Sequence, residues 1–389
     1  MKIINGSVFL EDGKFQQATV ACKDGKITEI TTGDALSANS SEAGEEIIDA
    51  TDCYVIPGLC DIHLHGCMSY DACDGTKDAL KEMAKYEAAH GITSILPTTM
   101  TYPEDTLTTI ANAVRDYRIY DNDTPGHATI HGINMEGPFI SPEKKGAQNP
   151  KYIQRCDINM FHRINLASGG AVRLCDIAPE MDGAMEFIDE ARKETRVSIA
   201  HTTADYDTCK QAFDRGARHL THLFNAMPPF THRAPGPIGA AAENENVTPE
   251  IICDGIHVYP AAVNLMYKVF GSERLIMISD SMRATGLPDG EYELGGQPVT
   301  VKGRLATLHD GTIAGSATNL YDCMITAVKD MHIPLEDAIL CASRNPAKAV
   351  GIYRTVGSIA LGKQADFVII NKSDLMIKAV IVRGQYGKG

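Results

Sequence analysis

The fold and a candidate metal site are both indicated by one stretch, Val55-Ile56-Pro57-Gly58-Leu59-Cys60-Asp61-Ile62-His63-Leu64-His65-Gly66. Its apolar residues predict a buried strand over 55–63. Successive side chains of a strand point to opposite faces, so His63 and His65 are expected on one face with converging imidazoles. Two such imidazoles can hold a divalent transition metal. Because 13 histidines in 389 residues also make chance pairs, the rest of the chain must decide the matter.

The composition indicates a large, acidic enzyme-sized protein. A chain of 389 residues with 44% hydrophobic content can bury a large core, and its length suits one catalytic domain plus a smaller one. The net charge of −14, with both signs interspersed, disfavours nucleic acid and anionic membranes as partners. Any anionic substrate therefore needs a local basic pocket.

The cysteines and the apolar runs point to a cytoplasmic location. The 11 cysteines are scattered and contain no C-x-x-C pair, which favours reduced thiols over a disulfide framework. Neither a signal sequence nor an apolar run long enough to span a membrane is recognisable. We therefore expect a cytoplasmic protein.

Both ends of the chain have the texture of small β structure. Short apolar runs broken by polar turns occur at 2–4, 18–22 and 27–30, the last after the hairpin signal Asp24-Gly25, and again at 357–361, 367–370 and 377–382. Residues 1–54 and 355–389 are predicted to form one small, discontinuous β-sandwich domain.

Between these ends, strand-like runs alternate with helical patterns, which is typical of repeated βα units. Helical patterns include Leu80, Met83, Ala84 and Ala88 on one face before Gly91, and Ala184, Phe187, Ile188 and Ala191 on another. Residues 55–354 are therefore predicted to form an α/β fold, a (β/α)8 TIM-type barrel, with a β insertion near 290–311. The eight expected strands cover residues 55–63, 93–96, 129–135, 172–178, 197–200, 219–222, 251–253 and 275–279.

Several residues that can bind metal fall at the C-terminal ends of these expected strands. In such a barrel those ends face one mouth, so residues far apart in sequence become neighbours there. Each one alone has an ordinary interpretation as a loop acid or a hydrogen-bonded core histidine, but their common position predicts a metal site. The six are His63, His65, Glu136, His201, His222 and Asp280.

Longer motifs resemble a known family. The opening Pro57-to-Gly66 stretch resembles the metal-binding strand of the amidohydrolase superfamily, and further segments resemble N-acetylglucosamine-6-phosphate deacetylases within it. These segments run in order along nearly the whole chain: Asn134-Met135-Glu136-Gly137-Pro138-Phe139, Ala200-His201-Thr202-Thr203-Ala204, Thr221-His222-Leu223-Phe224-Asn225-Ala226-Met227, Cys253-Asp254-Gly255-Ile256-His257-Val258 and Ser279-Asp280.

The resemblance implies specific roles. Glu136, His201 and His222 match the principal metal ligands, Asp280 matches the catalytic aspartate, and His257 matches the histidine that polarises the substrate carbonyl. The expected substrate contacts are Ala147, Gln148, Asn225, Ala226, Arg233, His257, Ile313, Ala314 and Gly315.

Three details of this resemblance stay open. Some members have histidine in place of Gln148, and some lack the H-x-H and use one metal, whereas this chain keeps His63 and His65. Either one or two ions, zinc or iron, are therefore expected, with Glu136 available to bridge two. Arg233 resembles an arginine that reaches the substrate phosphate across a homodimer interface, and whether it serves its own subunit or its neighbour is undecided.

The function that the resemblance implies is metal-dependent hydrolysis of the acetamide of N-acetylglucosamine 6-phosphate, a small-molecule sugar phosphate, to glucosamine 6-phosphate and acetate in amino-sugar catabolism. A metal lowers the pKa of bound water from about 15.7 towards 7, and Asp280 is expected to move the proton. One alternative is a related hydrolase that attacks a cyclic amide or an amidine carbon. Another is a barrel without catalytic activity that serves as a scaffold.

Overall fold

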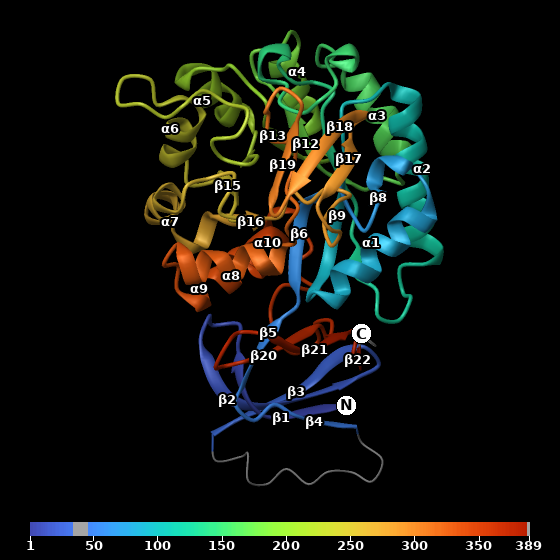
Figure 1. The fold of residues 1–389 in the computed structure, drawn as a ribbon, viewed down its shortest axis with the longest axis vertical. Coiled ribbons are helices and arrows are strands. Elements are labelled where there is room, and N and C mark those ends of the chain that lie inside the picture. Colours follow the sequence, from blue (N-terminus) through green and yellow to red (C-terminus); the bar gives the residue numbers. More distant parts are fainter. Residues whose placement is uncertain (34–45, 387–389) are drawn as a thin grey trace.

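The fold consists of a helix-covered barrel and, below it, a smaller β unit that contains both termini (Figure 1). The structure is a computed structural model and describes residues 1–33 and 46–386.

Eight parallel strands form the barrel and appear in the order that the sequence predicts. Hydrogen bonds from Asp280 N to His63 O (2.9 Å) and from His65 N to Ser281 O (2.7 Å) join the last strand to the first. The fold class is thus confirmed as a TIM-type barrel. Its strands are β6 (Leu59–Leu64), β9 (Ile92–Thr99), β11 (Ile133–Glu136), β12 (Val172–Ile177), β13 (Arg196–Ile199), β14 (His219–Leu220), β15 (Thr248–Ile252) and β16 (Ile276–Ile278).

Two of the expected strands are each divided in the structure. The strand expected over 55–63 is wrong as a single strand, because β5 (Cys53–Pro57) pairs with the terminal sheet and only β6 belongs to the barrel. Periodicity could not reveal the break at Gly58, since the residues on both sides are apolar and buried. The run at 129–135 likewise divides into β10 (Thr129–Ile130) and β11.

Helices cover the outside of the barrel, and their apolar faces are those expected from the sequence. Leu80, Met83, Ala84 and Ala88 of α1 (Lys77–Ala89) are all buried, as are the four predicted positions of α4 (Ala184–Ala191). The other α-helices are α2 (Glu104–Tyr120), α3 (Ile158–Ala167), α5 (Tyr206–Arg215), α6 (Gly236–Glu243), α7 (Pro260–Arg274), α8 (Leu320–Asp330), α9 (Leu335–Ile339) and α10 (Asn345–Ala349).

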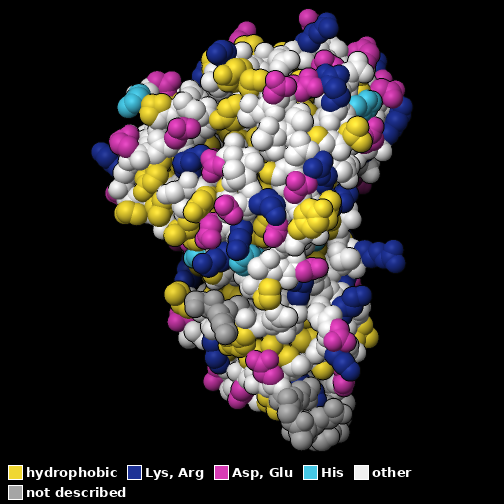
Figure 2. Space-filling view, turned by 90° about the vertical axis from the view of Figure 1, so that its right-hand side faces the viewer, with side chains coloured by type: hydrophobic (Ala, Val, Ile, Leu, Met, Phe, Trp, Pro, Cys, Tyr) yellow, Lys and Arg dark blue, Asp and Glu magenta, His cyan; other side chains and the backbone are white. Residues whose placement is uncertain are grey.

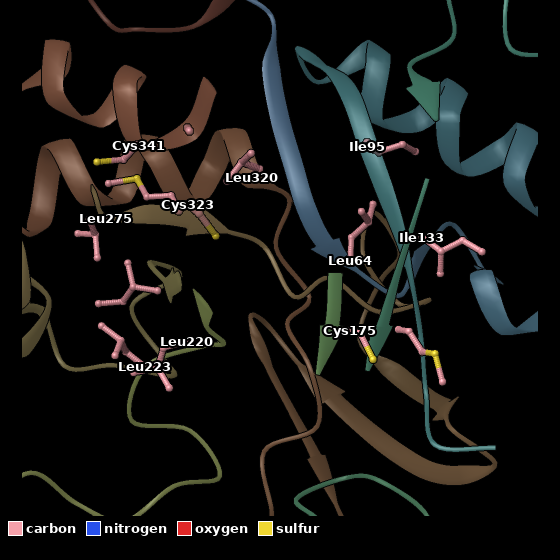
Figure 3. Close-up of a cluster of buried hydrophobic side chains, with 14 of the residues drawn as sticks. Leu64, Ile95, Ile133, Cys175, Leu220, Leu223, Leu275, Leu320, Cys323 and Cys341 are labelled. Atoms are coloured by element: carbon pink, nitrogen blue, oxygen red, sulfur yellow. The ribbon is translucent and has the colours of Figure 1, made fainter. Parts of the chain in front are cut away.

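The barrel strands are buried on both faces, as a closed parallel barrel requires. Ile95 of β9 and Cys175 of β12 belong to the large apolar cluster shared with the helices, part of which is drawn in Figure 3. Their neighbours Leu96 and Leu174 belong to a separate cluster that includes Ala347 of α10. The alternation leaves few positions for polar side chains inside the barrel, so those that occur there need partners.

The small β unit is an eight-stranded sheet assembled from the two ends of the chain. The predicted Asp24-Gly25 hairpin is present, with φ of 51° and 73°, as a two-residue turn between antiparallel strands requires. The strand expected over 357–361 is wrong: it is reduced to one bridge between Ile359 and Leu10, beside Gly357 at φ 82°. The strands are β1 (Lys2–Phe9), β2 (Phe15–Lys23), β3 (Lys26–Thr32), β4 (Ile47–Asp49), β5, β20 (Phe367–Asn371), β21 (Ile377–Val382) and β22 (Gln385–Tyr386).

The division between the two units, expected at residues 54/55 and 354/355, stays a prediction. The pairing of β5 with β1 and β20 favours Gly58 as the first boundary. The expected insertion is a three-stranded antiparallel sheet, β17 (Gly290–Leu294), β18 (Gln297–Lys302) and β19 (Leu305–Leu308), which lies above the barrel mouth in Figure 1.

The surface agrees with the composition. Acidic and basic side chains are interspersed over the face in Figure 2, without one large region of a single sign. All 11 cysteines are free thiols. Within residues 1–33 and 46–386, no helix has the length and apolar character needed to cross a bilayer.

Gly58 provides a test of the connection between the two units. A Cβ at this position would lie 2.1 Å from Thr93 Oγ1 and 2.7 Å from Thr93 Cγ2, too close for either atom. We expect Gly58→Ala to lower the free energy of unfolding by about 1–3 kcal/mol, the usual cost of overpacking, as measured by urea denaturation. Adding Thr93→Ala should recover part of the loss, because both atoms are then gone. Equal losses with and without Thr93→Ala would contradict this packing.

Candidate metal and catalytic site

The candidate metal-binding side chains lie where the barrel strands end. Glu136 is the last residue of β11, and His65 directly follows β6. His201, His222 and Asp280 come just after β13, β14 and β16, with φ of 43°, 27° and 50°. Left-handed backbone is unfavourable for residues other than glycine and tends to occur at functional sites. Three such residues at one mouth indicate that the backbone is held in place to aim these side chains.

The carboxylate of Glu136 lies at the centre of the cluster. Its Oε1 is 3.0 Å from His201 Nε2 and 3.2 Å from His222 Nε2, and these two imidazole nitrogens are also 3.2 Å apart. Three atoms this close, all able to donate an electron pair, can share one ion. They belong to the three residues that the resemblance implies as ligands of a principal metal.

A second group of ligands adjoins the first. His65 Nε2 lies 3.3 Å from Glu136 Oε2 and 3.2 Å from Asp280 Oδ1. His63 Nε2 lies 3.5 Å from Glu136 Oε1 and 3.6 Å from Asp280 Oδ1. Glu136 thus faces both groups, so a second ion held by His63, His65 and Asp280 is geometrically available.

The partners of the other ring nitrogens orient three imidazoles. Nδ1 of His201 lies 2.9 Å from Lys144 O, and Nδ1 of His65 lies 3.3 Å from Thr98 O. Because a carbonyl only accepts, each Nδ1 carries a proton, and in the neutral ring each Nε2 then keeps a free electron pair. Nδ1 of His63 lies 3.1 Å from Glu250 Oε2, with the same consequence. In the neutral form, all three histidines can therefore offer Nε2 to a metal ion.

The charges of the cluster also fit a cation. Burial by itself raises the pKa of Glu136, but His63 and the hydrogen bonds of His201 and His222 hold that pKa well below its usual value. Burial lowers the pKa of His63, yet Glu250 and Glu136 together raise it well above its ordinary value. The carboxylates thus stay ionised and draw positive charge to the imidazoles. A divalent ion can supply that charge instead of protons.

Gln148 contacts the ligand cluster directly. Its Nε2 donates to Glu136 Oε2 at 2.7 Å, and its Oε1 accepts from Thr101 N at 2.7 Å. The second bond fixes the orientation of the amide, so that its donor faces the carboxylate. Gln148 therefore orients Glu136 as well as lining the cavity.

A cavity of about 260 Å³ opens over the cluster and contains most of the expected substrate contacts. Ala314 is fully buried and does not line it. Four further lining residues were not predicted, Met100, Gly146, Leu294 and Thr312, because none of them has a side chain whose chemistry or spacing marks a site. The expected residues that line it are Ala147, Gln148, Asn225, Ala226, His257, Ile313 and Gly315, together with His65, Glu136, His201, His222 and Asp280.

His257 is held at the cavity by Asp254, whose role sequence reasoning did not assign. His257 Nδ1 lies 2.7 Å from Asp254 Oδ2, and Asp254 Oδ1 accepts from the backbone N of His257 at 2.9 Å. Burial lowers the pKa of His257, but the hydrogen bond and charge of Asp254 outweigh it and raise that pKa. The raised pKa favours the doubly protonated ring, in which Nε2 can act as a donor. The D-x-x-H spacing in the loop after β15 was the available signal.

Arg233 lies away from this cavity. It is exposed in the long loop between β14 and α6, and lines a separate hollow with Pro228, Tyr206 and other residues. Phe230 in the same loop is 48% exposed. Within the single chain, Arg233 is therefore not among the residues that meet at the cluster.

Glu250 is the main residue that sequence reasoning missed. It lies inside β15, contacts His63 and His219, and is fully buried. An acidic residue next to the expected apolar strand at 251–253 was the only sequence signal, and its partners come from other strands.

Comparison with known proteins identifies the family. Residues 54–386 match the amidohydrolase family. The chain belongs to this family. It is 37% identical to the N-acetylglucosamine-6-phosphate deacetylase of Bacillus subtilis (strain 168), over 97% of this chain and 94% of that protein.

Two further relatives are similar over most of their length. An N-acetylgalactosamine-6-phosphate deacetylase of Escherichia coli O157:H7 is 34% identical, over 85% of this chain and 86% of that protein. A mutant of the N-acetyl-D-glucosamine-6-phosphate deacetylase of Mycobacterium smegmatis, solved in complex with N-acetyl-D-glucosamine-6-phosphate, has a TM-score of 0.91 and 31% identity, covering 100% of this chain and 99% of that one.

Proposed function

We propose that this protein hydrolyses the acetamide of N-acetylglucosamine 6-phosphate to glucosamine 6-phosphate and acetate, a step in amino-sugar catabolism. One observation carries the proposal: His65, Glu136, His201, His222 and Asp280 line the same cavity as His257. Metal ligands, a candidate proton carrier and a candidate carbonyl donor therefore face one space.

The principal ion would be held by Glu136, His201 and His222. A second ion would be held by His63, His65 and Asp280 and would share Glu136. Imidazole and carboxylate ligands suit both zinc and iron. When bound, such an ion supplies a nucleophile at neutral pH, because it lowers the pKa of coordinated water from about 15.7 towards 7.

Asp280 is the residue proposed to move the proton. Burial raises its pKa, but the hydrogen bond of His65 and the charge of His63 hold it below the ordinary value, so the group is an ionised base before reaction. In our proposal its carboxylate takes the proton of the attacking water and then donates it to the sugar nitrogen. The amine is a poor leaving group until it is protonated, so this second transfer lets the C–N bond break.

His257 is proposed to polarise the acetyl carbonyl. Its Nδ1 is occupied by Asp254, so its Nε2 is the atom available to the cavity. A donor placed where negative charge develops on the carbonyl oxygen typically accounts for about 3 kcal/mol of the barrier reduction.

Arg233 is proposed to bind the substrate phosphate from the neighbouring subunit of a homodimer. A guanidinium fork suits phosphate oxygens, and it would provide the local positive charge that the acidic protein needs. The exposed position of Arg233, outside the cavity of its own chain, supports action across an interface. The free thiols support a reducing, cytoplasmic location.

An acetate-release assay tests the function. Purified protein should release acetate from N-acetylglucosamine 6-phosphate, lose this activity after chelation, and regain it with added zinc or iron. The panel includes N-acetylgalactosamine 6-phosphate, because one relative carries that name, and both unphosphorylated sugars. Failure to release acetate from either phosphorylated sugar with any metal would refute the proposal, and faster hydrolysis of a cyclic amide would favour the alternative hydrolase.

Asp280→Asn tests the proton carrier. The amide keeps an oxygen ligand but cannot take up a proton, so kcat should fall by roughly 10²- to 10⁴-fold, the range for general acid–base catalysis. The ion at Glu136, His201 and His222 should be retained, so at least one ion per subunit is expected by inductively coupled plasma mass spectrometry. Asp330→Asn, at an exposed position on α8, is the control and should be unchanged. Normal turnover by Asp280→Asn would rule out this role.

Arg233→Ala tests the phosphate contact. KM for the phosphorylated sugar should rise roughly 10- to 100-fold, as for loss of a hydrogen bond to a charged group. Hydrolysis of the unphosphorylated sugar should be unaffected. If the arginine serves the neighbouring subunit, mixing Arg233→Ala with Asp280→Asn should restore about one quarter of normal activity, because mixed dimers then contain one complete site. No recovery after confirmed subunit exchange would place Arg233 in its own site.

A further inference from the structure

Glu250 lies directly behind the ligand cluster but outside the cavity. It is in the middle of β15, its exposed fraction is 0%, and it is absent from the cavity lining. It is therefore unable to touch a substrate. Its contacts are instead with two of the candidate metal ligands.

Both oxygens of the Glu250 carboxylate are used. Oε2 accepts from His63 Nδ1 at 3.1 Å and from the backbone N of His222 at the longer distance of 3.4 Å. Oε1 accepts from His219 Nε2 at 2.9 Å. The carboxylate thus connects one ligand from each of the two candidate ion positions with the interior of the barrel.

The hydrogen bonds behind Glu250 support its role as an acceptor. Arg196 Nη2 donates to Thr248 Oγ1 at 3.1 Å, and this hydroxyl lies 2.7 Å from His219 Nδ1. If the Thr248 hydroxyl donates to Nδ1, His219 must carry its proton on Nε2 and donate it to Glu250. This series of hydrogen bonds then ends on the ionised carboxylate of Glu250. Because that carboxylate only accepts, the proton of His63 must be on Nδ1.

The consequence appears at the other nitrogen of His63. His63 Nε2 is fully buried and has no hydrogen-bond partner, although it faces Glu136 and Asp280 at 3.5 and 3.6 Å. A buried nitrogen with a free electron pair costs free energy unless something binds it. A metal ion between this nitrogen and the two carboxylates would satisfy it.

We propose that Glu250 is a positioning residue for an ion at His63 and His65: it fixes the His63 ring, places its proton on Nδ1, and adds a negative charge behind it. The inference rests on the metal-dependent function proposed above, because it requires an ion at this pair. It goes further in assigning control of the second ion to a residue that touches neither ion nor substrate.

The effect is expected to be selective. Nδ1 of His65 and of His201 faces a neutral backbone carbonyl, and Nδ1 of His222 has no partner in the described structure. Among these four imidazoles, His63 alone has a carboxylate behind it. Loss of the Glu250 charge should therefore weaken the ion at His63 and His65 more than the ion at His201 and His222.

Glu250→Gln is the direct test. His63 and His219 reach different oxygens of Glu250, and a glutamine replaces one of these oxygens by an NH₂ group. Where the NH₂ faces His63, the ring must carry its proton on Nε2 and cannot bind metal. Zinc-loaded protein is dialysed against graded EDTA, and the ions retained per subunit are measured by inductively coupled plasma mass spectrometry. We expect the weaker ion to be lost at roughly 10- to 100-fold lower chelator concentration, the usual cost of removing a residue that orients a ligand. The tighter ion should be retained as in the unmodified protein.

Asp176→Asn is the matched control. Asp176 is equally buried in another barrel strand, β12, but its side chain accepts a hydrogen bond from Thr221 and not from a ligand imidazole. This variant should keep both ions. Circular dichroism of the same samples checks folding.

A second pair of variants serves if Glu250→Gln does not fold. His219→Gln keeps an N–H donor near Glu250, whereas His219→Asn keeps one near Thr248 and leaves Glu250 without it. Only His219→Asn should weaken the second ion.

The outcomes separate this inference from the proposed function. The inference would be overturned if Glu250→Gln lost both ions in parallel or retained both. It would also be overturned if unmodified protein held a single ion and still released acetate. The proposed function would stand in each case. Selective loss of the second ion, in a protein that releases no acetate from any sugar phosphate, would support the inference and refute the function.

Discussion

The structure depends on one constraint: the Glu136 carboxylate is buried and must be matched by positive charge. Four imidazoles approach it, from β6 and from the loops after β6, β13 and β14. An unmatched buried charge is very costly, so such a cluster persists only with protons or a cation. The parallel barrel solves the geometric part, because the C-terminal ends of all its strands meet at one mouth.

The backbone takes part in this arrangement. His201, His222 and Asp280 all adopt left-handed φ values, each of which costs of order 1–3 kcal/mol in a residue with a side chain. The hydrogen bond from Asp280 N to His63 O shows how the surroundings hold such a residue, since it also closes the barrel between β16 and β6. The hydrogen bond that closes the barrel therefore also helps to place Asp280, one of the candidate metal ligands. The substrate cavity is completed by loops and by the edge of the β17–β19 insertion, which contributes Leu294.

Sequence patterns predicted the parts that follow from local chemistry. Alternating apolar runs predicted the barrel strands and their order, and a polar residue after a run predicted His201, His222 and Asp280, because the C-terminal ends of parallel barrel strands meet at one mouth. The division at Gly58 was missed because β5 and β6 are equally apolar, and only pairing with distant strands separates them. Glu250 was missed for a related reason: its partners His63 and His219 are on other strands, and one acid beside an apolar run has no local signature. Whether Arg233 serves its own active site or that of a neighbouring subunit depends on how two subunits pack, and the sequence of one chain does not contain that information.

The most direct measurement of the central claim is anomalous X-ray diffraction from crystals of the metal-loaded protein, collected on both sides of the absorption edge of the bound metal. The account predicts a strong peak about 2.0–2.2 Å from Glu136 Oε1, His201 Nε2 and His222 Nε2, the usual range for zinc with such ligands. It predicts a second, weaker peak between His63, His65 and Asp280. Crystals of active protein with no anomalous peak within reach of Glu136 would contradict the account.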